Sequence, residues 1–401
     1  PTKGNGQWVT INPDGTTRHI KILKASTSSY FESIDVDSNG DVLIAGRNHG
    51  HTWMDMNDHT GPTVFSKLTT PYIGKYKANG DLVWSKRLNR CGDHAYEHSG
   101  VWDAKFISDD RIAVVGAYSG TPKWSCTQDG GEVEGMPGPG AYELGSSFPN
   151  HLTLGMRSYM AFMNSDGALE YAREIGSVTQ RSSAQQIVEH PVTGDLFILG
   201  LWENTITNPD DCGDGSPTDD RWFFAPAKPS ADFPLIGDHS RFTRVGGVEP
   251  CSAHEGGGVN HDHYLLHTDS LGNLKNHKLL DVHLEKVYGP SLAINSDGSE
   301  LAIVDSGIPQ SAASLTAAKG GGSNGWVLTL DTDDLSENWR GVNKQAIHGD
   351  DTDKYQYSWT HGVAYGPEDR VHAAGRTQWS TWFGSTDDGT LAYHHKTSIA
   401  N

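Results

Sequence analysis

The chain is a series of short apolar segments separated by tight polar turns. Residues 31–88 show the pattern most clearly, as FESIDVDSNGDVLIAG, a polar insert, and YIGKYKANGDLVWSKRL. Asn-Gly between two apolar runs is a strong hairpin signal, because both central residues of a type I′ turn need φ > 0. This segment therefore predicts two type I′ hairpins, or one four-stranded antiparallel unit.

The same two-hairpin unit returns along the rest of the chain. The first residues, QWVTINPDGTTRHIKIL, match its second hairpin alone. No segment sustains the 3.6-residue period of a helix. The predicted repeats are a leading half at about 7–23 and whole units at about 31–88, 100–175, 182–280, 287–341 and 358–396.

A repeated four-stranded unit predicts an all-β fold, a β-propeller of four-stranded antiparallel blades in a single domain over residues 1–401. A β-sandwich is the competing fold, but it does not predict the return of one unit. The leading half repeat leaves an open sheet edge. Either residues outside this chain complete it, or the ends of the chain pair. We predict six blade positions with the first incomplete, and a five-bladed ring is the alternative.

The second hairpin of the first whole unit resembles the SBBP-type β-propeller repeats of bacterial proteins. Those repeats carry the hairpin V-x-K-x-D-x-x-G-x-L-x-W, which is matched here by Lys75, Gly80, Leu82 and Trp84. Residues 164–169 and 269–274 match it more loosely. The resemblance implies a propeller and often an extracellular location, and it carries no catalytic residues.

Charge and hydropathy exclude some partners. The chain has 401 residues and a net charge of −19. A nucleic acid or an anionic membrane surface would favour a basic protein, so neither is expected as a partner. No apolar run approaches the roughly 18 residues of a membrane span. The first residues lack a signal-peptide pattern, so we expect Pro1 to be a mature or trimmed end.

Four cysteines lie in polar, glycine-rich loops. An even number in that setting indicates two disulfides and an oxidising compartment. We favour the pairs Cys91–Cys126 and Cys212–Cys251, since each pair falls in loops of one face. Four reduced thiols are the alternative. The expected location is extracellular or at the cell surface, with the periplasm as a further option.

Long inserts fall on one side of the predicted blades. In an up-and-down blade, the 1–2 and 3–4 turns lie on one face and the 2–3 loops lie on the other. The long inserts are all 2–3 loops, at about 47–70, 117–157, 202–261 and 306–324. Loops on a rigid scaffold often carry binding, and loops longer than about 15 residues are uncommon unless functional or disordered. These inserts therefore either bind a partner or only cover the blade ends.

Aromatic residues and histidines in these inserts are the candidate binding residues. Indole rings stack on sugars or are buried at protein interfaces. The simpler interpretation is local packing for the indoles and hydrogen-bonded loops for the histidines. The candidates are Trp53, Trp124, Trp222, His49, His51, His261 and His263.

Calcium is the one cofactor that the sequence suggests. The insert over residues 208–220 is dense in carboxylates, and its candidate ligands are Asp210, Asp211 and Asp214. Calcium prefers such oxygen ligands. The turn Asp35-x-Asp37-x-Asn39-Gly40 opens like a calcium loop, but Gly46 stands where an EF-hand needs Glu. A plain hairpin turn also explains this second pattern.

An enzyme that acts on polysaccharides is the alternative function. In a lyase, a histidine takes a sugar proton, a tyrosine protonates the leaving oxygen, and an arginine neutralises the uronate. The catalytic candidates are His94, His98, Tyr96, His361, Tyr357 and Arg376. A hydrolase would need a carboxylate pair, for which the candidates are Glu97, Asp103 and Glu203. Nucleotide-binding and serine-hydrolase motifs are absent from the sequence.

The function that the sequence favours is binding or structural assembly. We expect an extracellular β-propeller whose inserts contact a protein or a glycan. An enzyme should bring His, Tyr and Arg, or two carboxylates, together in one pocket. A binding module should spread its aromatic and acidic loops outward.

Overall fold

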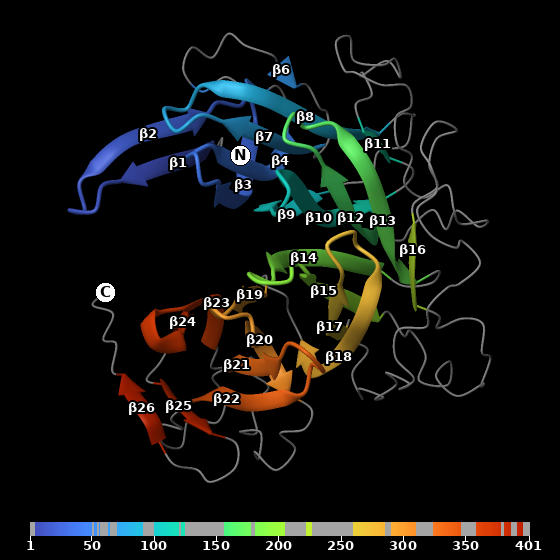
Figure 1. Ribbon diagram of the computed structural model, residues 1–401. Helices are drawn as coiled ribbons and strands as arrows, with labels where there is room; N and C mark the ends of the chain where they lie inside the picture. Colours follow the sequence, from blue (N-terminus) through green and yellow to red (C-terminus); the bar gives the residue numbers. More distant parts are fainter. Residues whose placement is uncertain are drawn as a thin grey trace. The chain divides into compact units, whose positions relative to one another are not determined.

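The computed structural model describes most of the blade strands and parts of the inserts. The chain divides into two compact units, Pro1–Ile187 with Pro217–Arg244, and Val188–Ser216 with Val245–Asn401. In its described part the chain is all strands except for one short 3-10 helix, Pro367–Asp369 (Figure 1). The described residues are 5–49, 52–53, 56, 63–64, 70–90, 100–119, 122–124, 156–177, 181–204, 222–226, 260–284, 290–309, 324–345, 358–377, 381–385 and 391–395.

The first unit contains two full sheets and one leading hairpin. The leading hairpin is β1 (Gly6–Ile11) with β2 (Thr17–Leu23). The first blade has the strand order β3 (Ser28–Val36), β4 (Val42–His49), β7 (Thr70–Tyr76) and β8 (Leu82–Arg90). The second blade has the order β9 (Gly100–Ile107), β10 (Arg111–Ser119), β12 (Met156–Met163) and β13 (Leu169–Ser177).

The chain passes from the first unit to the second within β14 (Arg181–Glu189). The third blade has the order β14, β15 (Leu196–Asn204), β17 (Asn260–Thr268) and β18 (Leu274–Leu284). The fourth has β19 (Ser291–Ile294), β20 (Glu300–Pro309), β21 (Asn324–Asp331) and β22 (Glu337–Gln345). A separate trailing hairpin is formed by β23 (Ser358–Tyr365) and β24 (Val371–Thr377).

These sheets confirm the predicted fold class. Each blade takes four antiparallel strands in chain order, as the repeated two-hairpin pattern predicts. The described residues form four complete blades, two separate hairpins of the repeat and one short pair within an insert. The six blade positions and the five-bladed alternative therefore both stay predictions.

The segment that follows the second strand of a blade returns to the fourth strand of the preceding blade. This happens three times, and the end of one second strand, β20, makes the same pairing. After β10, β11 (Pro122–Trp124) pairs with β8, and after β15, β16 (Trp222–Pro226) pairs with β13. The end of β20 pairs with β18, and after β24, β25 (Thr381–Ser385) pairs with β22. The bases of these inserts are thus fifth strands of neighbouring blades.

This return differs from the sequence prediction at the C-terminal end. The repeat pattern made residues 381–395 the second hairpin of the fifth unit. In the structure, β25 and β26 (Leu391–His395) extend the fourth blade, because β25 pairs with β22 over five residues from Gly341 to Gln345. A similar short pair, β5 (Thr52–Trp53) with β6 (Thr63–Val64), lies in the insert of the first blade.

The Asn-Gly turns are not of type I′, and the sequence prediction of that turn type was wrong. In the turn Asp37–Gly40, the amide of Gly40 donates to Asp37 O at 3.0 Å, and Gly40 has φ +80° while Asn39 has no positive φ. This is a type I turn followed by a left-handed glycine. The Asp37 carboxylate accepts from the amides of Asn39 and Asp41 at 2.9 and 2.8 Å, which favours this turn.

A glycine lies within the second strand of several blades for a steric reason. A Cβ on Gly46 would lie 2.0 Å from Tyr30 O, and one on Gly116 would lie 2.1 Å from Gly100 O. Bulges in β3 and β9 press these carbonyls onto the glycines. Tyr72 donates its hydroxyl to Tyr30 O at 3.3 Å, so a tyrosine of the third strand completes the motif.

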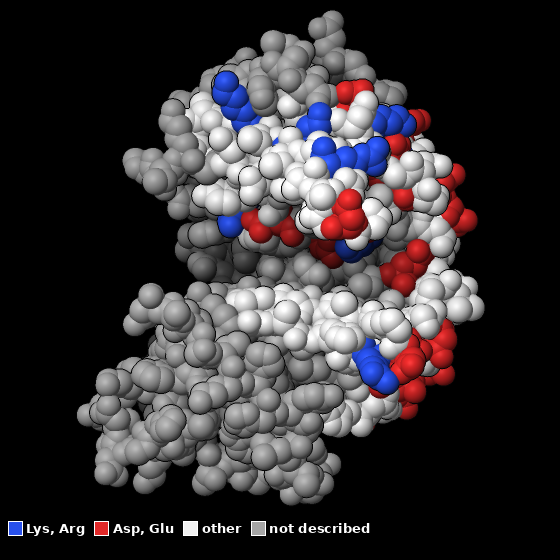
Figure 2. All heavy atoms as spheres, turned by 90° about the vertical axis from the view of Figure 1, so that its left-hand side faces the viewer, with Lys and Arg blue, Asp and Glu red and all other residues white. Residues whose placement is uncertain are grey.

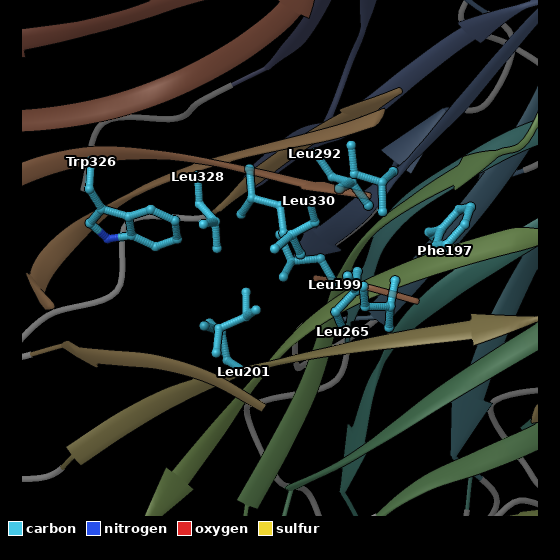
Figure 3. Close-up of a cluster of buried hydrophobic side chains, with 12 residues drawn as sticks. Phe197, Leu199, Leu201, Leu265, Leu292, Trp326, Leu328 and Leu330 are labelled. Atoms are coloured by element: carbon cyan, nitrogen blue, oxygen red, sulfur yellow. The ribbon is translucent and has the colours of Figure 1, made fainter. Parts of the chain in front are cut away.

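The cores lie between neighbouring blades. Within the second unit, one buried cluster takes side chains from β15, β17 and β21, including Phe197, Leu265 and Leu328 (Figure 3). In the first unit, Leu43, Ile73 and Val114 belong to an equivalent cluster between the first and second blades. Each large apolar side chain buried in this way contributes about 1.5–3 kcal/mol to stability.

Candidate functional site

A buried histidine–aspartate pair stands where the fourth blade departs from the repeat. His263 Nε2 of β17 lies 2.8 Å from Asp305 Oδ2 of β20, and neither side chain is exposed to solvent. Thr360 Oγ1 of β23 donates to Asp305 O at 3.0 Å. Asp305 therefore joins three successive sets of strands within the second unit.

Asp305 occupies the position that glycine holds in the other blades. Gly46 lies opposite Tyr72, Gly116 opposite Tyr159, and Gly200 opposite Tyr264. In the fourth blade the corresponding pair is Asp305 opposite Trp326. Two substitutions at one packing position, with a buried carboxyl group as the result, mark this place as the clearest departure from the repeat.

Two ring nitrogens beside this pair lack partners. Among the described residues, His263 Nδ1 and Trp326 Nε1 are buried and form no hydrogen bond. The two rings meet edge to face, with centroids 5.6 Å apart. A buried polar nitrogen is usually satisfied by protein or by ordered water. The full burial of both side chains fits a structural pair within the second unit.

A second buried pair lies four residues further along β17. His267 Nε2 is 3.0 Å from Asp195 Oδ2, and Lys275 Nζ is 2.6 Å from the same oxygen. The imidazole of His267 stacks on the ring of Phe197 at 4.5 Å. Burial raises the pKa of the Asp195 carboxyl, but the hydrogen bonds from Lys275 and His267 outweigh it, so that the pKa lies below its ordinary value.

Asp103 connects the first strands of three blades. Its Oδ1 accepts the Ser33 hydroxyl of β3 at 2.5 Å and the Ala104 amide at 2.9 Å, and its Oδ2 accepts the Ile187 amide of β14 at 3.0 Å. The residue is 2% exposed. The sequence analysis named Asp103 as a candidate for a hydrolase pair. In the structure, its carboxylate forms hydrogen bonds that connect neighbouring strands.

Asp35, a neighbour of Asp103, has a pKa above its ordinary value. Asp35 Oδ2 accepts the Phe106 amide at 2.8 Å, and Lys105 Nζ is 3.8 Å from Asp35 Oδ1. Burial raises the pKa of Asp35, and the charge of Lys105 only partly offsets it. This pair also joins the first and second blades.

Surface charge is mixed over the described part of the first unit. Lys75 and Lys77 pair with Asp41 at 3.3 and 3.0 Å, and Arg47 pairs with Glu32 at 2.8 Å. Figure 2 shows basic and acidic side chains beside one another on this unit. The net charge of −19 is therefore not gathered into a single acidic field over this surface.

Several predicted binding residues lie on the short strands of the inserts. Trp53 is in β5, Trp124 in β11 and Trp222 in β16. His49 ends β4, and His261 lies in β17 two residues before His263. The structure describes the backbone of these five positions. Trp124 and Trp222 thus belong to fifth strands that are paired with neighbouring blades.

The predicted catalytic set is only partly described. His361 is exposed at a bulge of β23, and Arg376 lies in β24 opposite Trp359. The other predicted site residues lie outside the described residues. They are His51, His94, Tyr96, His98, Tyr357, the aspartates Asp210, Asp211 and Asp214, and the cysteines Cys91, Cys126, Cys212 and Cys251.

Sequence reasoning missed the partners of His263. The sequence pattern alone does not single out Asp305, Trp326, Asp195 or His267. What distinguishes Asp305 is its position in the repeat. It stands where the other blades have the glycines Gly46, Gly116 and Gly200. Within the described residues no group of three or more His, Cys, Asp or Glu is arranged to hold a metal ion.

No protein-family model matches this chain. No curated protein matches it either. Among solved structures, it is similar to a periplasmic gluconolactonase of Pseudomonas aeruginosa at 11% identity and a TM-score of 0.37, covering 98% of this chain and 95% of that one. It is similar to Kuenenia stuttgartiensis hydrazine synthase at 12% identity and a TM-score of 0.33, covering 92% and 94%.

A third similar structure is a Bacteroides caccae protein of unknown function, at 9% identity and a TM-score of 0.29, covering 84% and 89% of the two chains. At such low scores these likenesses carry no argument about activity. The resemblance to SBBP-type repeats stays a prediction. A search of the described residues finds no helix that is long and apolar enough to span a membrane.

Proposed function

We propose that this protein is a β-propeller binding or assembly module, whose inserts contact a protein or a glycan. The proposal rests on how the inserts begin or end. Short strands of the inserts pair with the fourth strand of the preceding blade. Three segments that follow a second strand, and the end of the second strand β20, pair with a neighbouring fourth strand. Strand pairing positions part of each long insert on the rigid scaffold. Such positioning is favourable for a recognition surface.

The buried ionisable groups support a role without catalysis. Asp103, Asp195 and Asp305 each hold neighbouring strands together through hydrogen bonds to buried partners. A catalytic acid or base must instead reach a substrate proton. The buried carboxylates Asp103, Asp195 and Asp305 and their histidine partners thus have structural roles in the described interior.

The aromatic candidates give the proposed surface its chemistry. Trp53, Trp124 and Trp222 lie on insert strands. Tryptophan at such positions suits stacking on a sugar ring or burial in a protein interface. We further propose an extracellular, cell-surface or periplasmic location, disulfides among the four cysteines, and calcium at the acidic insert around Asp210.

A polysaccharide panel tests this function. Neutral and anionic polysaccharides are run against the chain in affinity electrophoresis, with calcium or with a chelator, and the recovered polysaccharide is sized by mass spectrometry. We expect retention of at least one polysaccharide with its length unchanged. Shortened chains or new unsaturated ends would overturn the proposal and establish the enzyme alternative.

Matched variants locate the surface. Replacing Trp53, Trp124 and Trp222 by Ala should abolish retention. The control is Trp339→Ala, because Trp339 is 40% exposed on β22 and lies outside the inserts. Equal retention by both variants would remove the insert strands from the binding surface.

A further inference from the structure

One arginine of the first blade lies between two aromatic rings. The guanidinium carbon of Arg47 is 5.2 Å from the ring centroid of Tyr30 and 5.1 Å from that of Trp102. Both distances are short enough for a cation–π contact. With Glu32, these residues form the arginine cluster, and all four belong to the first compact unit. Arg47 lies two residues before the end of β4, where the chain enters its first insert.

The register of the first blade brings three of these side chains together. Tyr30 of β3 lies directly opposite Arg47 of β4, so the two side chains project from the same face of the sheet. A bulge between Phe31 and Ser33 leaves Glu32 as the extra residue of β3, and a bulge re-aims such a side chain. The Glu32 carboxylate accepts a hydrogen bond from Arg47 Nε at 2.8 Å.

Trp102 comes from an equivalent bulge in the second blade. Its neighbours Val101 and Asp103 both pair with β10, and Trp102 is the extra residue between them. A Cβ on Gly100 would lie 3.1 Å from two ring atoms of Trp102, so a glycine there leaves room for the indole. Asp103 accepts the Ser33 hydroxyl of β3 at 2.5 Å, which fixes β9 beside the first blade. The cluster is therefore built on strands that hydrogen bonds hold in place.

The repeat does not require this cluster. In the second blade, the positions of Tyr30 and Arg47 are taken by Gly100 and Ala117. That blade still forms the same four antiparallel strands. The aromatic residue and the arginine of the first blade therefore have a reason other than strand pairing.

One edge of the Arg47 guanidinium is open. Among the described residues, the only hydrogen bond of this side chain runs from Nε to Glu32. The two terminal nitrogens, Nη1 and Nη2, have no hydrogen-bond partner in that part of the chain, and the side chain is 36% exposed. Two parallel N–H groups of a guanidinium match the two oxygens of a carboxylate. The open edge therefore suits a ligand that carries a carboxylate.

An exposed aromatic ring lies beside this arginine. Tyr30 is 49% exposed although it contacts Arg47. An aromatic face of this kind packs against the C–H face of a sugar ring. A sugar with a carboxylate would use both groups at once, the ring on Tyr30 and the carboxylate on Arg47.

We propose that the arginine cluster is a subsite for a uronate, a sugar that carries a carboxylate. The carboxylate binds Nη1 and Nη2 of Arg47, and the sugar ring packs on Tyr30. Glu32 and Trp102 hold the guanidinium in place. This inference rests on the proposed binding of glycans and names their class. The net charge of −19 does not prevent such binding, because exposed charges more than about 8 Å away are largely screened at physiological ionic strength.

Titration calorimetry with short uronates tests the subsite. The probes are trisaccharides of glucuronate, galacturonate and mannuronate, each compared with the same trisaccharide after methyl esterification of its carboxyl groups. We expect at least one free uronate to bind, and its methyl ester to bind at least about tenfold more weakly, because the ester cannot form the charged bidentate pair. Equal binding of the two forms would overturn the proposal, as would a lack of binding by every uronate.

Arg47→Lys separates the arginine fork from its charge. Lysine keeps the positive charge and loses the two parallel donors, so the affinity for the uronate should fall at least about tenfold. The matched control is Arg111→Lys. Arg111 also lies over an aromatic ring, with its guanidinium carbon 5.6 Å from the Phe162 centroid, but it begins β10 at the end away from the insert. This control should leave the affinity unchanged.

A second variant keeps the test decisive if Arg47→Lys fails to fold. Tyr30→Ala removes a half-exposed ring and should also weaken the uronate, with thermal melts to confirm that each variant is folded. Wild-type affinity in a folded Arg47→Lys or Tyr30→Ala variant would overturn the proposal.

A peptide series distinguishes a glycan from a protein partner. Tripeptides with a free C-terminal carboxylate are titrated under the same conditions. Tighter binding of a peptide than of every uronate would assign Arg47 to a protein partner and overturn the proposal.

The outcome is separable from that of the polysaccharide panel. Retention of neutral polysaccharides alone would leave the binding role intact and remove the uronate subsite. Shortened polysaccharides would overturn the binding role, while uronate affinity at Arg47 would still be measured by calorimetry.

Discussion

His263 Nε2 and Asp305 Oδ2 lie 2.8 Å apart in a fully buried pair that links the third and fourth blades. Removing one member leaves a buried polar group or charge without its partner, which typically costs about 3–5 kcal/mol. We expect His263→Ala and Asp305→Ala each to lower the free energy of unfolding by that amount in denaturant titrations.

The double variant His263→Ala, Asp305→Ala gives the matched comparison. It removes both members of the pair at once. It should lose less stability than the sum of the single variants, by about 1 kcal/mol or more. Additive losses would mean that the two side chains do not act as a pair.

Asp103 should be among the most sensitive carboxylates of the first unit. Asp103→Ala leaves the Ser33 hydroxyl and the Ile187 amide without their acceptor. We expect a loss of about 3 kcal/mol, seen as a lower midpoint of chemical unfolding. Asp333→Ala, at an exposed turn, is the control and should change stability by less than about 0.5 kcal/mol.

Gly46 should not tolerate a side chain. A Cβ there would lie 2.0 Å from Tyr30 O, so Gly46→Ala must shift the bulge of β3 at a cost of about 3 kcal/mol. Gly362→Ala is the control, because nothing lies within 4 Å of its Cβ position. A thermal melt of both variants tests this, and equal melting temperatures would contradict the steric role.

The Asp195 cluster should make the second unit sensitive to acid. The folded pKa of Asp195 lies below its ordinary value of 3.8, through Lys275 and His267. Its stabilisation is therefore present above pH 3.8 and is lost as the pH falls through the lower folded pKa. Lys275→Met should flatten the fall in stability between about pH 4 and pH 2, measured by denaturant midpoints. An unchanged slope would exclude Lys275 as the source.

The sequence predicted the blades because their signals are local. The turn Asp37–Gly40 and the glycine at position 46 recur at fixed offsets, and each has a steric reason within its own hairpin. The turn type was wrong, because the Asp37 side chain caps the turn and keeps only Gly40 at positive φ. That side-chain effect is not visible in the Asn-Gly signal.

Contacts between blades could not be predicted in the same way. The pairing of β25 with β22 depends on the path of an insert through space, which the repeat pattern does not encode. His263 was named as a binding residue because of its neighbours in sequence. Its partner is 42 residues away, and the pair is part of the scaffold. The proposed binding by the inserts therefore rests on Trp53, Trp124 and Trp222.

The native mass of the protein tests its role as a binding or assembly module most directly. The protein is purified from its source under native conditions, and its mass by light scattering is compared with the mass of the same chain after denaturation. The account predicts a native mass above the denatured mass by at least one bound partner. Equal native and denatured masses would contradict it.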